Sequence, residues 1–303
     1  FSANIVKNNS GHTLDIESNT MTITGNGAAL TNNGTVSGTT SSVIEFASTG
    51  TTGTTISAAS YPGKLKVNRA SNAFTIAAGT LTTGGDLEIA AGTLDLTAND
   101  PTTTVNGSVT IAGVLQGSNL NSLTVRGNWT NNGTYTANGG TVVIDPVGTA
   151  VTIGGSADTT FASFTSNTQG KSLRFGAGRT IGFVGTLTLN GQNGRPIYVE
   201  SDTPGSQWTI DNLGASSLAY VYVKDSACTP ASNTLFLGET GDILGNVGAC
   251  WSRPDRGAGA PPSGGGGTPA GGGGAGGGAG TEGGSGGGSG SGGGTPGGGA
   301  PSP

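Results

Sequence analysis

Apolar and polar residues alternate in short units along the first 256 residues of the chain. Each unit is apolar, polar, apolar, and it places two side chains on one face of a β-strand. No stretch has apolar residues at the i, i+3, i+4 and i+7 spacing of an amphipathic helix, so we predict almost no helix. The twelve units are Leu14/Ile16, Met21/Ile23, Leu65/Val67, Phe74/Ile76, Leu87/Ile89, Leu94/Leu96, Val109/Ile111, Leu123/Val125, Val151/Ile153, Leu173/Phe175, Leu187/Leu189 and Val221/Val223.

Glycine and asparagine separate these units and limit how the strands can be arranged. Strands this short bury too little for an ordinary antiparallel sandwich, whose strands have about 5 or 6 residues. In a parallel β-helix each coil needs only two or three short strands, because the next coil supplies the backbone partners and the rest of the core. Gly and Asn tolerate the positive φ of tight corners. The sequence therefore predicts an all-β fold, a parallel β-helix (β-solenoid).

The chain also shows a longer self-similarity. The word Thr-Asn-Asn-Gly-Thr occurs at 31–35 and again at 130–134. Each copy is followed by a strand-like unit, at 43–46 and 142–145, and then by a Thr-Ile pair, at offsets of 99, 99 and 97 residues. Three matches in the same order predict a module that occurs twice.

Composition divides the chain into two segments. We expect a β-solenoid domain at 1–256, with modules at roughly 20–100 and 120–195 and a capping segment at 196–256. The tail at 257–303 holds 26 of the 61 glycines and no large apolar residue, so it cannot build a core. Two interpretations of this Gly/Ser/Pro-rich tail stay open. It is either a flexible linker or a bare backbone that packs on this or an adjacent subunit.

A family resemblance begins at Asn128. The stretch Asn-Trp-Thr-Asn-Asn-Gly-Thr-Tyr-Thr at 128–136, followed by Gly-Thr-Val-Val-Ile-Asp at 140–145, resembles a module of secreted bacterial β-helix repeat proteins. These are surface adhesins similar to filamentous haemagglutinin. Residues 208–251 look like the segment that closes such helices, and the cysteine beside Trp251 departs from that pattern. The resemblance implies a surface or extracellular location and a structural or adhesive role.

Cys228 and Cys250 are the two cysteines of the chain. Neither lies in a Cys-x-x-Cys motif or near histidines, so a metal site is not indicated. We predict a disulfide, which closes a loop of about 22 residues and contributes roughly 3 kcal/mol. Two buried free thiols are the alternative. A disulfide implies an oxidising, extracellular setting.

Charge limits the partners that the chain can have. The pI is about 4.7, the net charge is −5, and the 12 Lys and Arg residues are scattered, so no basic patch for nucleic acid is expected. No apolar run approaches the roughly 20 residues of a membrane span. The chain begins at Phe1, and we expect that a signal was removed or that the numbering starts inside a precursor.

Residues able to do chemistry are sparse. Asp15, Glu17 and Glu88 alternate with apolar residues, which places them on outward strand faces rather than in the converging set that a glycan-cleaving site requires. His12 is the only histidine and lacks a second ligand or nucleophile nearby in the sequence. We expect no catalytic residue, no cofactor and no metal, and a polysaccharide-active β-helix enzyme ranks last among the functions.

Two features leave glycans open as ligands or attached groups. The aromatic residues either form a sugar-stacking platform or fill the core and caps of the solenoid. These residues are Trp129, Trp208, Trp251, Tyr220 and Tyr222. Triplets that fit the N-glycosylation pattern begin at Asn8, Asn33, Asn106, Asn128 and Asn132.

The ends of a solenoid decide the function that we expect. Terminal coils expose unpaired strand edges, which must be capped or paired with another chain. The apolar start, Phe1, Ile5 and Val6, is expected to complete a neighbour's terminal coil or to cap its own chain. We therefore predict a non-catalytic structural subunit of an extracellular filament or surface assembly, which polymerises with copies of itself. A surface adhesin or carbohydrate-binding stalk is the alternative.

Overall fold

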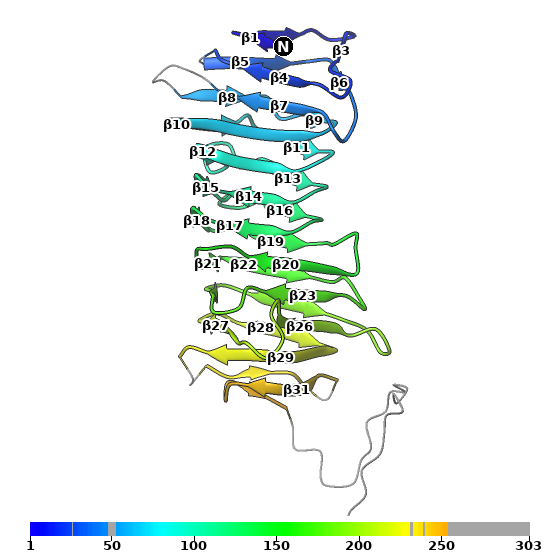
Figure 1. The fold of residues 1–303 in the computed structure, drawn as a ribbon, viewed down its shortest axis with the longest axis vertical. Coiled ribbons are helices and arrows are strands. Elements are labelled where there is room, and N and C mark those ends of the chain that lie inside the picture. The colour runs from blue at the N-terminus through cyan, green and yellow to red at the C-terminus, as the bar shows by residue number, and fades with distance from the viewer. Residues whose placement is uncertain (26, 48–52, 231–232, 239, 254–303) are drawn as a thin grey trace, which may run out of the picture. The chain divides into compact units, whose positions relative to one another are not determined.

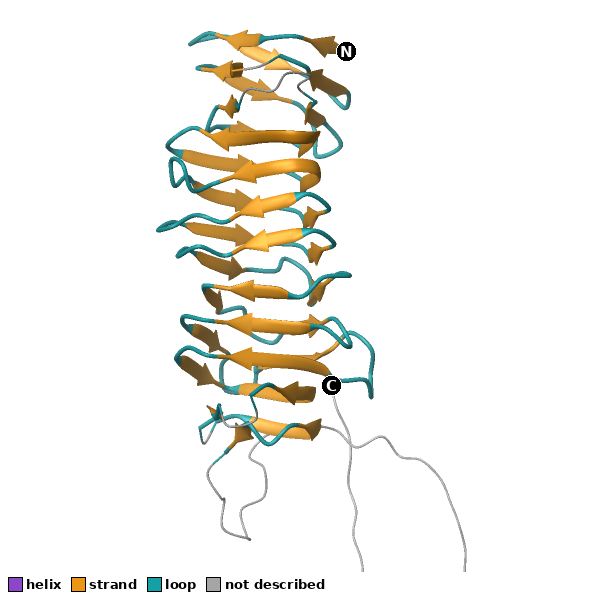
Figure 2. Ribbon diagram, turned by 90° about the vertical axis from the view of Figure 1, so that its left-hand side faces the viewer, coloured by secondary structure: helices purple, strands orange, loops and turns teal. Residues whose placement is uncertain are grey.

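The computed structural model describes residues 1–253 except 26, 48–52, 231–232 and 239. The described residues form short strands joined by turns and contain no helix (Figure 2). Each circuit of the chain contributes to three faces, and successive circuits stack in chain order (Figure 1). The fold is a parallel β-solenoid of about 11 turns, so the predicted fold class is confirmed. The predicted tail at 257–303 lies outside the described residues.

The first and second faces belong to one 20-stranded sheet. The first face comprises β1 (Ser2–Ala3), β4 (Thr20–Ile23), β7 (Val43–Phe46), β14 (Val109–Ile111), β17 (Trp129–Asn131), β20 (Ala150–Gly154), β23 (Ser172–Phe175) and β26 (Ile197–Ser201). The second comprises β2 (Val6–Asn8), β5 (Gly27–Asn32), β8 (Thr54–Ile56), β15 (Val114–Gln116), β18 (Thr134–Thr136), β21 (Thr159–Phe161), β24 (Thr180–Phe183) and β27 (Trp208–Asn212). Four strands continue from the first face into the second: β10 (Lys64–Ile76), β12 (Leu87–Asp95), β29 (Val221–Cys228) and β31 (Asp242–Val247).

The third face is built around an eight-stranded sheet. Its strands are β9 (Ser60–Tyr61), β11 (Thr80–Thr83), β13 (Thr102–Val105), β16 (Ser122–Val125), β19 (Thr141–Ile144), β22 (Ser163–Ser166), β25 (Leu187–Asn190) and β28 (Ser216–Ala219). Before them stand β3 (Thr13–Asp15) and β6 (Thr35–Ser37), and after them β30 (Leu235–Phe236) and β32 (Trp251–Ser252), each a two-stranded pair.

Every ladder is parallel and joins residues one coil apart. Leu235 pairs with Trp251 and Thr180 with Thr209, so the number of residues from one strand to its partner in the next coil varies between 16 and 29. The amide of Leu87 donates to the carbonyl of Ser108 at 2.9 Å, which is typical of the bonds between coils. Backbone groups in short strands thus find partners above and below, which a buried backbone requires.

The inward pairs predicted from the sequence form the core. All of these residues are buried except Leu14, which is half-buried in the first coil and packs against the core. The register of the strands places apolar side chains of successive coils directly above one another. One such inward ladder consists of Leu65, Leu87, Val109 and Trp129. The apolar, polar, apolar units of the sequence therefore predict correctly which side chains point into the core of the solenoid.

Two corner glycines are explained by space rather than by positive φ. A Cβ on Gly84 would lie 2.0 Å from the carbonyl oxygen of Pro62, and one on Gly214 would lie 1.6 Å from that of Gly185. These atoms belong to the preceding coil. At such corners glycine is needed because neighbouring backbones touch. At Gly194, by contrast, φ is +73°, as the sequence interpretation expected.

The two Thr-Asn-Asn-Gly-Thr words lie on different faces. The copy at 31–35 runs from β5 on the second face to β6 on the third, whereas the copy at 130–134 runs from β17 on the first face to β18 on the second. The units that follow are displaced in the same way, since 43–46 lies on the first face and 142–145 begins on the third. The coil is therefore the structural repeat, and the proposed module boundaries stay a prediction.

An aromatic cluster fills the core where the first-face ladder changes register. Trp129 pairs with Ile153 across β17 and β20, and buried Asn131 points inward beside it. The Asn131 amide donates to the carbonyl of Asp158 at 2.9 Å and to Oγ1 of Thr159 at 3.1 Å, so its burial is compensated. The cluster comprises Trp129, Tyr135, Phe161, Phe164 and Phe183, with ring centroids in contact at 4.9 to 5.9 Å.

Replacing Trp129 tests this packing. Trp129→Ala removes a fully buried ring, and we expect a loss of about 3–5 kcal/mol in local stability. Hydrogen exchange should show faster exchange in β14, β17 and β20, because each coil of a solenoid depends on its neighbours. Thr130→Ala, an outward position on the same strand, is the control and should change stability by less than about 0.5 kcal/mol. Equal effects of the two variants would contradict this account of the core.

Candidate functional site

Within the described residues, the strands of the first coil are paired on one side only, and we call their other side the open edge. Strands β1, β2 and β3 pair with β4, β5 and β6 on one side, and within the described residues they have no strand partner on the other. The carbonyl oxygens of Phe1 and Ala3 accept from the amides of Thr22 and Thr24, both at 2.9 Å. Because successive residues of a strand point their backbone groups in opposite directions, Ser2 directs its own N–H and C=O away from the stack.

The predicted assembly residues lie at this end. Phe1 is 64% exposed and Ile5 is 52% exposed, while Val6 is half-buried and packs against the core. The three residues therefore differ in their surroundings. Val6 packs in its own coil, whereas Phe1 and Ile5 leave apolar surface exposed at the edge. The nitrogen of Phe1 donates to the carbonyl oxygen of Thr20 at 2.8 Å, which joins this residue to the next coil.

The last described coil carries the disulfide. Cys228 at the end of β29 is bonded to Cys250, with their Cα atoms 6.0 Å apart, so the disulfide expected from the sequence is present. Next to it, the indole N–H of buried Trp251 donates to Oγ of Ser226 at 3.0 Å. Strands β31 and β32 again have a strand partner on one side only among the described residues. Phe236 and Leu244 are 56% and 46% exposed there.

A buried carboxylate organises the same end. Asp225 is 2% exposed, with φ of 52°, and accepts from the Asn246 amide at 2.7 Å and from the Gly205 amide at 3.0 Å. Burial acts to raise its pKa, but these hydrogen bonds and the charge of Lys224 outweigh burial and hold the pKa below its ordinary value. The ionised carboxylate therefore ties β29 to β31 and to the segment before β27.

The first face carries a ladder of opposite charges. Lys66 lies between Glu45 and Glu88 in register, with nitrogen to oxygen distances of 3.4 and 3.7 Å, and Lys64 reaches Glu88 at 2.9 Å. The hydrogen bond to Glu88 raises the pKa of Lys64. Burial raises the pKa of Glu45, but the amide of Asn68 and the charge of Lys66 bring it below the usual value. These acids are engaged in cross-coil pairing.

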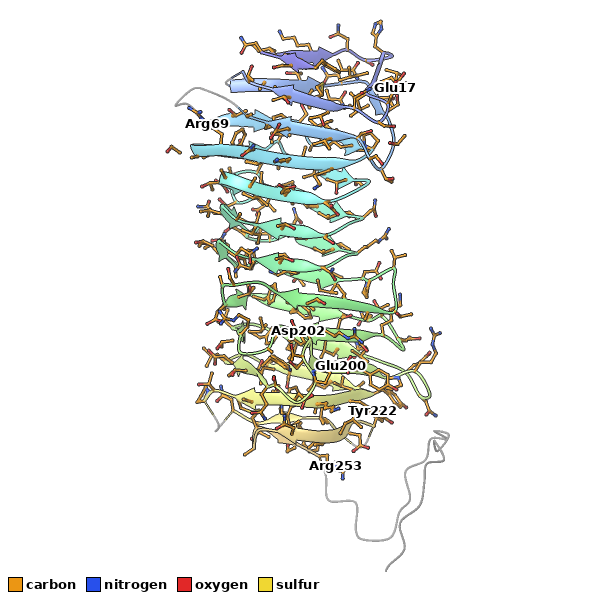
Figure 3. The ribbon with its side chains drawn as sticks, in the orientation of Figure 1. Glu17, Arg69, Glu200, Asp202, Tyr222 and Arg253 are labelled. Carbon is orange, nitrogen blue, oxygen red and sulfur yellow. A yellow bond between two sulfur atoms is a disulfide. The ribbon has the colours of Figure 1, made fainter. Side chains whose placement is uncertain are left out.

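The same face continues toward the last coil with further pairs. Arg174 bonds Glu200 at 3.0 Å, and the rings of Tyr198 and Tyr222 meet edge to face at 5.8 Å. Glu200 and Tyr222 lie on neighbouring coils (Figure 3).

The third face is different, because no charged residue occurs in its eight-stranded sheet. Its central outward ladder consists of hydroxyl side chains with a single valine. In register it runs through Thr82, Thr104, Thr124, Val143, Thr165, Thr188 and Ser217. With neighbouring strands about 4.8 Å apart, this ladder is a regular, neutral hydrogen-bonding surface.

The remaining residues considered for catalysis or metal binding do not lie together in one site. His12, Asp15 and Glu17 are exposed, and Glu88 is half-buried on an outward position. Within the described ranges no group of three or more His, Cys, Asp or Glu side chains is placed to hold a metal ion. The described residues also include no helix long and apolar enough to cross a membrane.

The aromatic residues resolve into two groups. Trp129, Trp208 and Trp251 are buried, so they fill the core and do not form a sugar-stacking platform. Tyr220 and Tyr222 are half-buried on the outside.

Sequence reasoning missed the third-face ladder and the buried Asp225. The ladder had a signal, because Thr-x-Thr and Ser-x-Thr words recur at 80–82, 102–104, 122–124 and 163–165, interrupted by Thr-Val-Val at 141–143. Asp225 had none, since its partners lie about 20 residues away on either side in the chain.

Comparison with known proteins identifies no relative. No family model, no curated protein and no solved structure matches this chain. The conclusions about its function therefore depend on its own geometry.

Removing the disulfide should affect one end only. Cys228→Ser combined with Cys250→Ser removes the cross-link of a 22-residue segment, and we expect a loss of roughly 3 kcal/mol in the stability of the last coil. Hydrogen exchange should accelerate in β29 to β32 and stay unchanged in β10 to β16. Uniform acceleration along the chain would contradict local closure by this bond.

Acid should loosen the same coil. Because the pKa of Asp225 is depressed in the folded state, its stabilisation is complete above the ordinary pKa of 3.8 and is lost as the pH falls through the lower folded value. Exchange of the β29 and β31 amides should therefore accelerate, after correction for intrinsic rates, as the pH falls below 3.8. Asp225→Asn serves as the control, since it cannot titrate and should lose this pH dependence. An unchanged pH profile in that variant would sink the assignment.

Proposed function

We propose that this chain is a non-catalytic structural subunit of an extracellular filament or surface assembly, in which copies join end to end through their terminal coils. The support comes mainly from the open edge of β1, β2 and β3. A parallel edge with unpaired N–H and C=O groups is a template for another strand. The exposed Phe1 and Ile5 add apolar area beside that edge. A neighbour's last coil, with β31 and β32 at its border, offers strands of matching direction.

The disulfide supports the extracellular part of the proposal, because such bonds persist in oxidising compartments. The relationship to haemagglutinin-like surface proteins, suggested by the residues from Asn128 onward, belongs to the same proposal. The engagement of Glu45 and Glu88 with lysines supports a structural role for the acidic residues of the first face rather than acid–base catalysis.

A surface adhesin or carbohydrate-binding stalk is the second candidate. The observation that favours it is the neutral hydroxyl ladder of the third face, since sugar chains are bound by many directed hydrogen bonds. The two functions are compatible, because the ends would serve assembly and the third face would serve binding.

Proline substitutions at the open edge test assembly. Ser2→Pro and Lys7→Pro remove amides that we expect to point away from the second coil, since Phe1, Ala3 and Asn8 make the inward bonds. The combined variant should raise the critical concentration for polymerisation roughly tenfold or more, because each lost bond is worth about 1 kcal/mol. Ser2→Ala with Lys7→Ala keeps both amides and is the matched control. The measurement is light scattering with negative-stain microscopy of the full chain.

Three results are informative. Polymers of the wild type and of the alanine control, with none at the same concentration of the proline variant, support end-to-end joining. A wild-type protein that stays monomeric at high concentration overturns the proposal. Polymerisation of the proline variant at the wild-type concentration places the contact elsewhere and overturns the role of this edge.

A further inference from the structure

A polar groove lies along the corner between the third and first faces. Its volume is about 670 Å³, within the usual range for ligand sites of roughly 300–1,000 Å³. Outward residues of β16 and β19, Thr124 and Val143, form one part of its lining. The other part comes from the corner segments that follow β19, β22 and β25, on one side of the stack (Figure 1). These segments contribute Asn167, Thr168, Gln169, Lys171 and Arg195.

The groove has an excess of positive charge, although the whole chain carries −5. Its one carboxylate, Asp145, already binds Arg126 at 3.3 Å and accepts from Thr168 Oγ1 at 3.4 Å. Lys171 Nζ donates to the carbonyl oxygens of Pro146 and Val147, which carry no formal charge. Neither Lys171 nor Arg195 has an ion-pair partner in the part of the chain that the structure describes.

Backbone bonds hold the cationic side of the groove in place. Gln192 and Arg195 exchange two backbone hydrogen bonds of 2.8 and 3.1 Å around a turn that contains Gly194. The backbone N–H of Gly170 donates to the Arg195 carbonyl at 3.0 Å, and the side-chain Nδ2 of Asn190 donates to Oδ1 of Asn167 at 3.1 Å. Neighbouring corner segments are therefore tied together, which lowers the entropy lost when a ligand binds.

We propose that this groove binds an acidic polysaccharide, with the anionic groups of the sugar chain paired to Arg195 and Lys171. The guanidinium of Arg195 fits a carboxylate or sulfate through two parallel bonds, and Lys171 supplies a second cation. Asn167, Thr168 and Gln169 offer amides and a hydroxyl to sugar hydroxyl groups. The neutral third-face ladder continues beyond Thr124 on neighbouring coils and extends the polar track for further sugar units.

The size and charge of the groove disfavour other anions. A single phosphate would leave most of 670 Å³ empty. Nucleic acid binding needs many phosphate contacts, and two cations on an acidic chain are too few. The chemistry therefore favours a long, polyhydroxylated chain with spaced charges.

Matched polysaccharides test the chemistry. Calorimetry of the full chain should show binding of polygalacturonate or of dextran sulfate, and none of fully methyl-esterified polygalacturonate or unmodified dextran. The first pair probes carboxylates and the second probes sulfates, so the two arms identify which anion the groove accepts. Binding should weaken as salt rises, because the contacts are ionic.

Variants test the residues. Arg195→Gln and Lys171→Gln should each weaken binding roughly tenfold or more, since charge-assisted hydrogen bonds are lost while the backbone bonds of the corner remain. Arg174→Gln, which alters an exposed cation paired with Glu200 on the first face, is the matched control and should bind as the wild type does. Circular dichroism of each variant verifies that the solenoid is intact.

The proposal is overturned if the wild type binds neither acidic polymer, or if the groove variants bind as tightly as the Arg174→Gln control. It is also overturned if neutral dextran binds equally well. Repeating the titration on the Ser2→Pro, Lys7→Pro protein separates this site from assembly. Binding that persists in that protein shows that the groove works within one subunit, whereas loss of binding assigns the ligand to the polymer and overturns a site complete in a single chain.

Discussion

Backbone hydrogen bonding from each coil to the next is the constraint on which this molecule depends. Most of the strands have two to five residues, which is too short to hold a sheet by side-chain burial alone, and they are stable because each coil completes the backbone hydrogen bonds of its neighbours. The inward ladders follow from the same register, since Leu65, Leu87 and Val109 stack only because their strands are aligned. The same bonding joins β1, β2 and β3 to the next coil on one side.

The sequence predicted the fold through its short inward units, and these were reliable because period-2 alternation is local. The disulfide could be expected because only one pairing of two cysteines exists. The equivalence of the Thr-Asn-Asn-Gly-Thr words could not be judged, since the same strand-turn-strand unit fits more than one corner. Arg195, Lys171 and Asp145 line one groove from coils of unequal length, so their placement depends on loop lengths that periodicity does not encode.

The three faces divide physical tasks according to their outward residues. On the first face, charges of opposite sign alternate over neighbouring coils at Glu45, Lys66 and Glu88 and again at Arg174 and Glu200, so these ion pairs cross coil boundaries and support the stacking. On the third face, hydroxyl groups replace charges, and the surface is free to exchange its hydrogen bonds with water or with another molecule. Charged cross-coil pairs and an uncharged hydroxyl ladder thus lie on different faces of the same solenoid and use different side chains.

Coils of 16 to 29 residues share one core, so the extra residues of the longer coils lie in the corner segments. A corner segment can therefore lengthen, shorten or change its charge while the ladders on either side keep their register. The strands and the core of the solenoid therefore stay the same when a corner segment changes. New chemistry can arise on such a protein by insertion of a few residues at one turn, without any change to the packed interior.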